Sequence, residues 1–264
     1  MTASSFKSSD YLAMLRELAP DLVHLAITGY GTSGPAASRP GYDFVIQGMG
    51  GLMSITGEAD GSPYKAGVAL VDVLTAKDAT IGILAALNAR PASGRGSHLE
   101  VTLLSSLQGA LANQAQAYLG AGKVPKRMGN EHPSIVPYQL LECADGPLAV
   151  ACGNDGQFRR LTEVIGVPAL AYDARFATNN SRVEHRTELI PLLENALAAA
   201  STDVWRDKLV GVGVPAGPVA SIDEVVATTA LEVVAAGAAV QEVDGLIAGG
   251  EEAQKLNDQI KSFL

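Results

Sequence analysis

The sequence predicts an α/β protein with a partial parallel-sheet large domain and a smaller α+β domain. Two strand–turn–helix units support the large domain: one strand at 21–31 ends in glycines, and another at 98–104 precedes a long helical segment. Strands that alternate with helices are typical of a parallel sheet, because a helical crossover returns the chain to the same edge. A Gly- and Pro-rich stretch at 121–137 indicates the link to the second domain.

The large domain begins with apolar positions at helical spacing, which predict a helix over 10–18 with Asp10 as its N-cap. After the first strand, Ala, Leu and Ile on successive turns predict a helix over 73–90. The second strand, 98–104, leads into a predicted helix over 106–122 that glycines terminate.

The smaller domain opens with a predicted hairpin that turns at Ala144-Asp145-Gly146. Helices are then predicted over about 155–166, 185–199 and 201–211. The string SIDE at 221–224 is a capping box before a further helix. The predicted division is a large-domain part at 1–122, a small domain at 123–220 and a return segment at 221–264.

Composition excludes several classes of partner. The chain of 264 residues carries a net charge of -9 and has no basic run, which argues against nucleic acid and anionic membranes. Its two cysteines are too few for a disulfide framework, and neither they nor the four scattered histidines have metal-ligand spacing. No apolar run is long enough for a membrane span, and the N-terminus lacks a signal-peptide pattern. We therefore expect a cytoplasmic protein without a metal site.

The segment 39–72 carries the most chemistry, because it ends on Asp72 within the apolar run GVALVDVLTA. A buried carboxylate without partners would be strongly destabilising, so three interpretations arise. Asp72 could cap the helix at 73–90, pair with Lys65 or Arg39, or act as a carboxylate nucleophile. A capping carboxylate can also face a ligand, so the first and third interpretations are compatible.

Two other features of this region are less specific. The Tyr42-Asp43 pair is by itself typical of a structural turn. Gly50, Gly51 and Gly57 would allow the backbone to approach a phosphate, but their spacing is neither G-x-G-x-x-G nor a P-loop. No G-x-S-x-G nucleophile elbow is present in the sequence.

Nine strings in collinear order across about 20–230 resemble the class III CoA-transferases, the group of formyl-CoA transferase, carnitine CoA-transferase and 2-methylacyl-CoA racemase. The strings are ITGYGTSGP (27–35), RPGYDFVIQGMGGLMSITGEADG (39–61), KAGVALVD (65–72), IGILAALNAR (81–90), SGRGSHLEVTLL (93–104), RMGNEHPSIVPYQ (127–139), GNDGQFRRL (153–161), DARFATNNSRVEHR (173–186) and GVPAGPV (213–219).

The resemblance implies transfer of CoA between an acyl-CoA thioester and a free carboxylic acid through an aspartyl covalent intermediate. Asp72 ends the K-x-G-x-x-x-x-D string and matches the family nucleophile, and amides at the start of the following helix would stabilise the oxyanions. Arg39 and Tyr42 would line the CoA and acyl channel, and Asp43 would assist the nucleophile. The resemblance implies no permanently bound cofactor, because the CoA thioester is a substrate.

From the small domain, Asn154 and Asp155 would face the site by the same resemblance. Racemases of this family have a histidine proton-transfer base where this chain has Tyr42, and a phenol is a poor base at neutral pH, so transferase is favoured over a racemase-like isomerase.

The chain is shorter than full-length members and is expected to lack the N-terminal part of their large domain. It would then form only part of the family's interlocked dimer, as a homodimer or with a companion polypeptide. A truncated, non-catalytic subunit is the remaining alternative.

Overall fold

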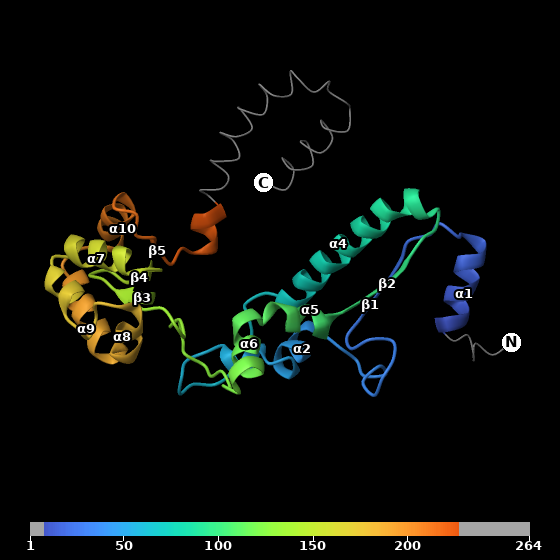
Figure 1. The fold of residues 1–264 in the computed structure, drawn as a ribbon, viewed down its shortest axis with the longest axis horizontal. Helices are drawn as coiled ribbons and strands as arrows, with labels where there is room; N and C mark the ends of the chain where they lie inside the picture. The colour runs from blue at the N-terminus through green and yellow to red at the C-terminus, as the bar shows by residue number, and fades with distance from the viewer. Residues whose placement is uncertain (1–7, 227–264) are drawn as a thin grey trace, which may run out of the picture. The chain divides into compact units, whose positions relative to one another are not determined.

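The computed structural model describes residues 8–226, which belong to two compact units, Met1–Pro133 and Ser134–Leu264 (Figure 1). The observed α/β character, with one parallel and one antiparallel sheet, confirms the predicted fold class. The predicted domain limits at 122 and 220 stay a prediction, and most of the predicted return segment lies outside the described residues. No helix within 8–226 is long and apolar enough to cross a bilayer.

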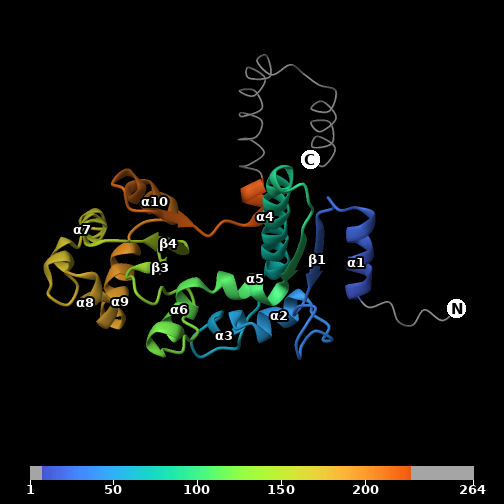
Figure 2. The same ribbon diagram turned by 45° about the vertical axis from the view of Figure 1, so that its right-hand side comes forward.

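The first unit has a two-stranded parallel sheet flanked by helices. Its elements are α1 (Ser8–Leu18), β1 (His24–Thr28), α2 (Asp43–Met49), α3 (Leu52–Ile55), α4 (Leu70–Ser93), β2 (His98–Thr102), α5 (Leu103–Ala110) and α6 (Ala112–Ala121). The register runs from His24 opposite His98 to Thr28 opposite Thr102. Helix α4 lies along both strands and makes the crossover between them, as the order of elements predicts (Figures 1 and 2).

Several predicted boundaries in this unit are wrong. The strand predicted at 21–31 is shortened to His24–Thr28, and the helix predicted at 73–90 extends over Leu70–Ser93. Helix α1 begins at Ser8, so Asp10 lies inside the helix rather than at its N-cap. Strand β2 ends at Thr102 because the Oγ1 atom of Thr102 accepts a hydrogen bond from the Ser105 N–H at 3.0 Å and caps α5. The single helix predicted over 106–122 is divided between α5 and α6, where Ala112 has a φ of 44°. Helix α5 is anchored by buried side chains and α6 has none, a difference that local periodicity does not report.

The buried core of the first unit is small. Ile46, Val71, Leu103 and Leu107 pack together where α2, α4 and α5 meet. Part of α4 is exposed although it is apolar: Ile81 is 65% exposed and Leu84 is 61% exposed.

The second unit contains an antiparallel sheet of order β3-β4-β5 with surrounding helices. Its elements are β3 (Tyr138–Glu142), β4 (Pro147–Ala151), α7 (Asp155–Val164), a 3-10 helix (Pro168–Tyr172), α8 (Asn179–Glu184), α9 (Arg186–Leu197), α10 (Thr202–Gly211) and β5 (Ala216–Pro218). The predicted hairpin is confirmed, with Tyr138 opposite Ala151. The capping box is also confirmed, because the Ser221 N–H donates to Glu224 Oε2 at 2.7 Å.

Arg182 is a fully buried charge of this second unit, with no side-chain exposure. Its guanidinium donates to the carbonyls of Val136 (2.7 Å) and Phe176 (2.9 Å), pairs with Asp155 Oδ1 (2.8 Å) and lies over the Phe158 ring. A buried cation is tolerated only when its donors are satisfied. Arg182 meets that requirement by joining α8 to α7 and to the segment that precedes β3.

Replacing Arg182 with alanine should destabilise the second unit, because it leaves a cavity and removes donors from two carbonyls and one carboxylate. We expect a loss on the order of 3 kcal/mol in the free energy of unfolding. Trp205, the only tryptophan, is buried in this unit, so its fluorescence during urea unfolding reports the change.

The matched control is Arg159→Ala, which removes an exposed arginine of the same unit. An equal shift of the urea midpoint in both variants would contradict the role assigned to Arg182.

Candidate functional site

Helices α2 and α4 of the first unit begin next to each other, and Asp43 connects them. Asp43 is the first residue of α2, and its Oδ1 atom accepts the N–H of Val71 at 2.7 Å and that of Asp72 at 3.4 Å. The N-cap residue of α4, Ala69, has no side-chain acceptor. Asp43 therefore supplies the cap of α4 from another helix, and its charge is favourable at the positive end of the helix dipole.

Gln47 holds the Asp43 carboxylate in place. The Nε2 atom of Gln47 donates to Asp43 Oδ2 at 2.7 Å, and its Oε1 atom accepts the N–H of Ala66 at 2.8 Å. Gln47 has no exposed surface. Gln47 was not predicted from the sequence, although an amide four residues after Asp43 in the apolar run DFVIQGM was the available signal.

The loop between β1 and α2 places Tyr42 and Asp43 through a close backbone approach. A Cβ added to Gly29 would lie 2.8 Å from the Cα of Gly41, so neither position has room for a side chain. Glu100 on β2 fixes the same loop, since its two carboxylate oxygens accept from the backbone N–H and the hydroxyl of Thr32. Tyr42 precedes α2 and is 75% exposed.

Asp72 lies in the first turn of α4 with an exposed side chain. The interpretation of Asp72 as the N-cap is therefore wrong, because Asp43 performs the capping. Within 8–226 no ion pair includes Asp72, and the ammonium of Lys65 donates instead to the Ala66 carbonyl at 3.0 Å. The hypothesis of a buried ion pair is wrong as well. The third interpretation, a reactive carboxylate, stays a prediction.

The amides at the start of α4 were expected to stabilise the oxyanions, but in this structure they have other acceptors. Those of Val71 and Asp72 already donate to Asp43, and that of Val73 donates to the Ala69 carbonyl at 3.2 Å. They are therefore not available as an oxyanion site next to the Asp72 carboxylate, unlike the expectation from the resemblance.

The other predicted site residues have these surroundings. Arg39 is exposed in the loop before α2. In the second unit, Asn154 caps α7 by accepting the Gln157 N–H at 2.9 Å, and Asp155 pairs with Arg182. The last two contacts are structural, and roles in CoA binding stay a prediction for all three residues.

Histidines and cysteines form no metal cluster in the described part of the chain. The structure does bring His24 and His98 together across the strand pair, with their Nδ1 atoms 2.9 Å apart, which sequence spacing alone could not reveal. Burial raises the pKa of the Cys152 thiol to about 12. Cys143 is half-buried, and burial, with the nearby Asp145 and Glu142 carboxylates, also raises its pKa. Neither thiol has the lowered pKa of a cysteine nucleophile.

Comparison with known proteins gives a consistent result. Residues 11–249 match the model of CoA-transferase family III. The chain is 46% identical over 218 residues to succinate–glutarate CoA-transferase of Agrobacterium fabrum, covering 81% of this chain and 53% of that protein. It is 38% identical over 211 residues to succinyl-CoA:glutarate CoA-transferase of Homo sapiens, covering 80% and 48%.

A solved structure is similar along the same part of the chain. The CAIB/BAIF family protein from Brucella suis has a TM-score of 0.70 and 47% sequence identity, and the match covers 81% of this chain and 57% of that one. The chain spans about half the length of the curated relatives it matches.

Replacing Asp43 with alanine should loosen the start of α4 and leave the buried Gln47 amide without its acceptor. Loss of a cap costs about 1 kcal/mol, which corresponds to a roughly fivefold faster amide exchange at Val71 and Asp72. Hydrogen exchange of peptides covering the first turns of α4 measures this change. Asp78→Asn, an exposed change farther along α4, should leave these amides unaffected. Equal exchange in both variants would show that Asp43 does not cap the helix.

The raised pKa values of Cys143 and Cys152 predict that their thiols react slowly with disulfide reagents. At pH 8 the thiol of Cys152 stays neutral and buried, so Ellman's reagent should modify at most Cys143 in the folded protein and should modify Cys152 only after denaturation. Rapid release of two equivalents of thionitrobenzoate from the folded chain would contradict this assignment.

Proposed function

The chain belongs to CoA-transferase family III, and we propose from this premise that it transfers CoA between an acyl-CoA thioester and a carboxylic acid, with Asp72 as nucleophile. The observation that carries the proposal is that Asp72 is both accessible and fixed in position. Its side chain is exposed and free of ion pairs among the described residues, while its backbone is held by the Asp43 cap. A nucleophile needs both an accessible carboxylate and a fixed position.

The proposed reaction has two covalent stages. The Asp72 carboxylate attacks the carbonyl carbon of the acyl-CoA, the C–S bond breaks, and a mixed anhydride and CoA thiolate form. The thiolate then attacks the Asp72 carbonyl, which releases the acid and leaves an aspartyl-CoA thioester. The acceptor acid reverses these steps, so the new acyl-CoA leaves and the Asp72 carboxylate is restored.

Asp43 and Gln47 would position Asp72 and would not react themselves. The Asp43 carboxylate is engaged on both oxygens, by α4 amides and by Gln47, so it fixes the direction of α4 and thereby the place of Asp72. Arg39 and Tyr42 are the side chains we propose for the CoA and acyl channel, and CoA-binding roles for Asn154 and Asp155 stay predictions.

The position of Tyr42 also bears on the racemase alternative. A racemase of this family would need a proton-transfer base where this chain has a phenol. The named relatives in the comparison are transferases, which supports the same choice.

For the substrates, we propose a short dicarboxylic acid and its CoA thioester. The names of the relatives specify succinate and glutarate, oxalate, or mesaconate as the acids on which they act. These names support a dicarboxylate for this chain, and succinyl-CoA with glutarate is the first pair to test.

We propose in addition that another polypeptide, a second copy or a companion chain, covers part of the first unit. The exposed apolar side chains of α4, Ile81 and Leu84 among them, support this proposal. A dimer and a cytoplasmic location remain predictions.

Incubation with succinyl-CoA should modify the chain on Asp72. We expect a mass increase of one CoA less one water for the thioester, and conversion to a hydroxamate when hydroxylamine is added. Intact-mass spectrometry measures both products. Asp72→Asn, which keeps the shape of the side chain, should abolish the labelling.

Asp78→Asn on the same helix is the matched control and should label like the unmodified chain. Labelling that persists in Asp72→Asn would exclude Asp72 as the nucleophile. A chain that no acyl-CoA of a succinyl, glutaryl and oxalyl series labels would contradict transfer by this polypeptide by itself.

A further inference from the structure

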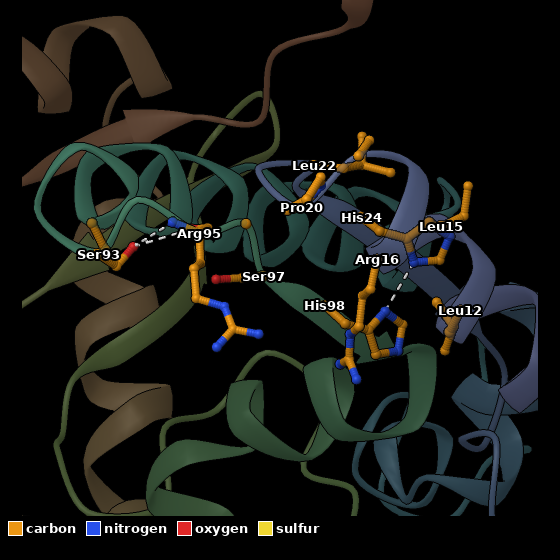
Figure 3. Close-up of a pocket in the computed structure, with 13 residues that line it drawn as sticks. Leu12, Leu15, Arg16, Pro20, Leu22, His24, Ser93, Arg95, Ser97 and His98 are labelled. Atoms are coloured by element: carbon orange, nitrogen blue, oxygen red, sulfur yellow. Dashed lines mark hydrogen bonds between the residues drawn. The ribbon is translucent and has the colours of Figure 1, made fainter.

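The first unit contains a cavity of about 510 Å³ (Figure 3). Residues of α1, of the loops on either side of the strand pair and of the end of α4 line it, with His24 and His98 at the beginning of β1 and β2.

This cavity and Asp72 lie at opposite ends of α4. Asp72 is in the first turn of the helix, whereas Ser93, its last residue, lines the cavity. A helix of 24 residues is about 36 Å long. The cavity is therefore a separate site and not an extension of the one around Asp72.

The lining is cationic in a protein of net charge -9. Arg16 comes from α1 and Arg95 from the loop after α4, and none of the 13 lining residues is acidic. Within 8–226, neither guanidinium takes part in an ion pair. The two imidazoles are stacked with their ring centres 5.0 Å apart and their Nδ1 atoms 2.9 Å apart, so their Nε2 atoms keep further hydrogen-bonding capacity.

The Arg95 loop has a fixed shape. The Ser93 hydroxyl accepts the N–H of Arg95 at 3.2 Å and donates to the Arg95 carbonyl at 3.1 Å. The second arginine is on the last turn of α1, where the helix dipole favours a cation. Dipole complementation accounts for Arg16 by itself, but not for Arg95, for the imidazole pair, or for a cavity that all four side chains line.

We propose that this cavity binds the phosphate group of a small molecule. Two guanidiniums supply charged donors for phosphate oxygens, and the imidazole N–H groups supply further hydrogen-bond donors. The volume exceeds that of a phosphate ion and lies in the usual range of ligand pockets, and Leu12, Leu15 and Leu22 give part of the wall an apolar surface. The ligand is thus a phosphate carried on an organic body, either a nucleotide or another phosphorylated metabolite. Two arginines in the wall disfavour a metal cation on the imidazoles.

The four histidines make the proposal directly testable by NMR of the full chain. Pyrophosphate is titrated at constant pH and ionic strength while the imidazole resonances are followed. We expect saturable shifts of His24 and His98, with His132 and His185 of the chain as internal references. The Arg16→Gln/Arg95→Gln double variant should weaken the affinity at least about tenfold. Arg159→Gln, a matched loss of exposed positive charge in the second unit, should leave the affinity unchanged.

Two further titrations distinguish the possible sources of the phosphate. Tighter binding of adenosine 3′,5′-bisphosphate than of glycerol 3-phosphate would support a nucleotide, and the opposite order would support another phosphorylated metabolite. Circular dichroism verifies that the double variant is folded. Shifts that do not saturate, that spread equally over all four histidines, or that persist unchanged in a folded double variant would overturn the proposal. Because CoA transfer is not measured, failure here is independent of the role of Asp72.

Discussion

The placement of the candidate site depends on one carboxylate, Asp43, which closes the N-terminus of α4 from a different helix. The first amides of any α-helix need acceptors, and α4 lacks a capping side chain of its own. Asp43 provides the acceptor, and the buried Gln47 amide fixes Asp43 in turn. The interaction is stabilising in two ways, because it satisfies the amides and complements the helix dipole. It also sets where the long α4 begins, and hence where the Asp72 carboxylate meets solvent.

The two units are stabilised by different interactions. The second unit packs a continuous apolar core around its sheet and uses Arg182 to join strand and helices through buried carbonyls. The first unit has four residues in its main buried cluster and a sheet of two strands. Two strands are marginally stable without a packed helix, so α4, which lies along both, has a large share in holding the unit together. Because the core is small, leucine and isoleucine side chains of α4 stay exposed.

The ends of α4 have opposite electrostatic character. Asp43 and Asp72 gather at the N-terminal end, and Arg90 and Arg95 lie at the C-terminal end. This distribution follows the helix dipole, which favours anions at the first turn and cations at the last. The same rule that stabilises the helix thus separates a carboxylate site, suited to covalent chemistry, from a cationic cavity, suited to anions. The 24-residue length of α4 keeps the two apart.

Local sequence determined the elements whose signals are local. The existence of the helix predicted at 73–90, the hairpin at Ala144–Gly146 and the Ser221–Glu224 capping box follow from periodicity and turn chemistry, and the strings around Asp72 indicated the family. Only the tertiary structure showed that Asp43 caps α4. Asp43 and Val71 are 28 residues apart in the sequence, and the local pattern offered Asp72 as a cap instead. The same holds for Gln47, for the division at Ala112 and for the His24–His98 pair, which spans 74 residues. Contacts between distant segments depend on packing, and no propensity or spacing rule within one segment encodes them.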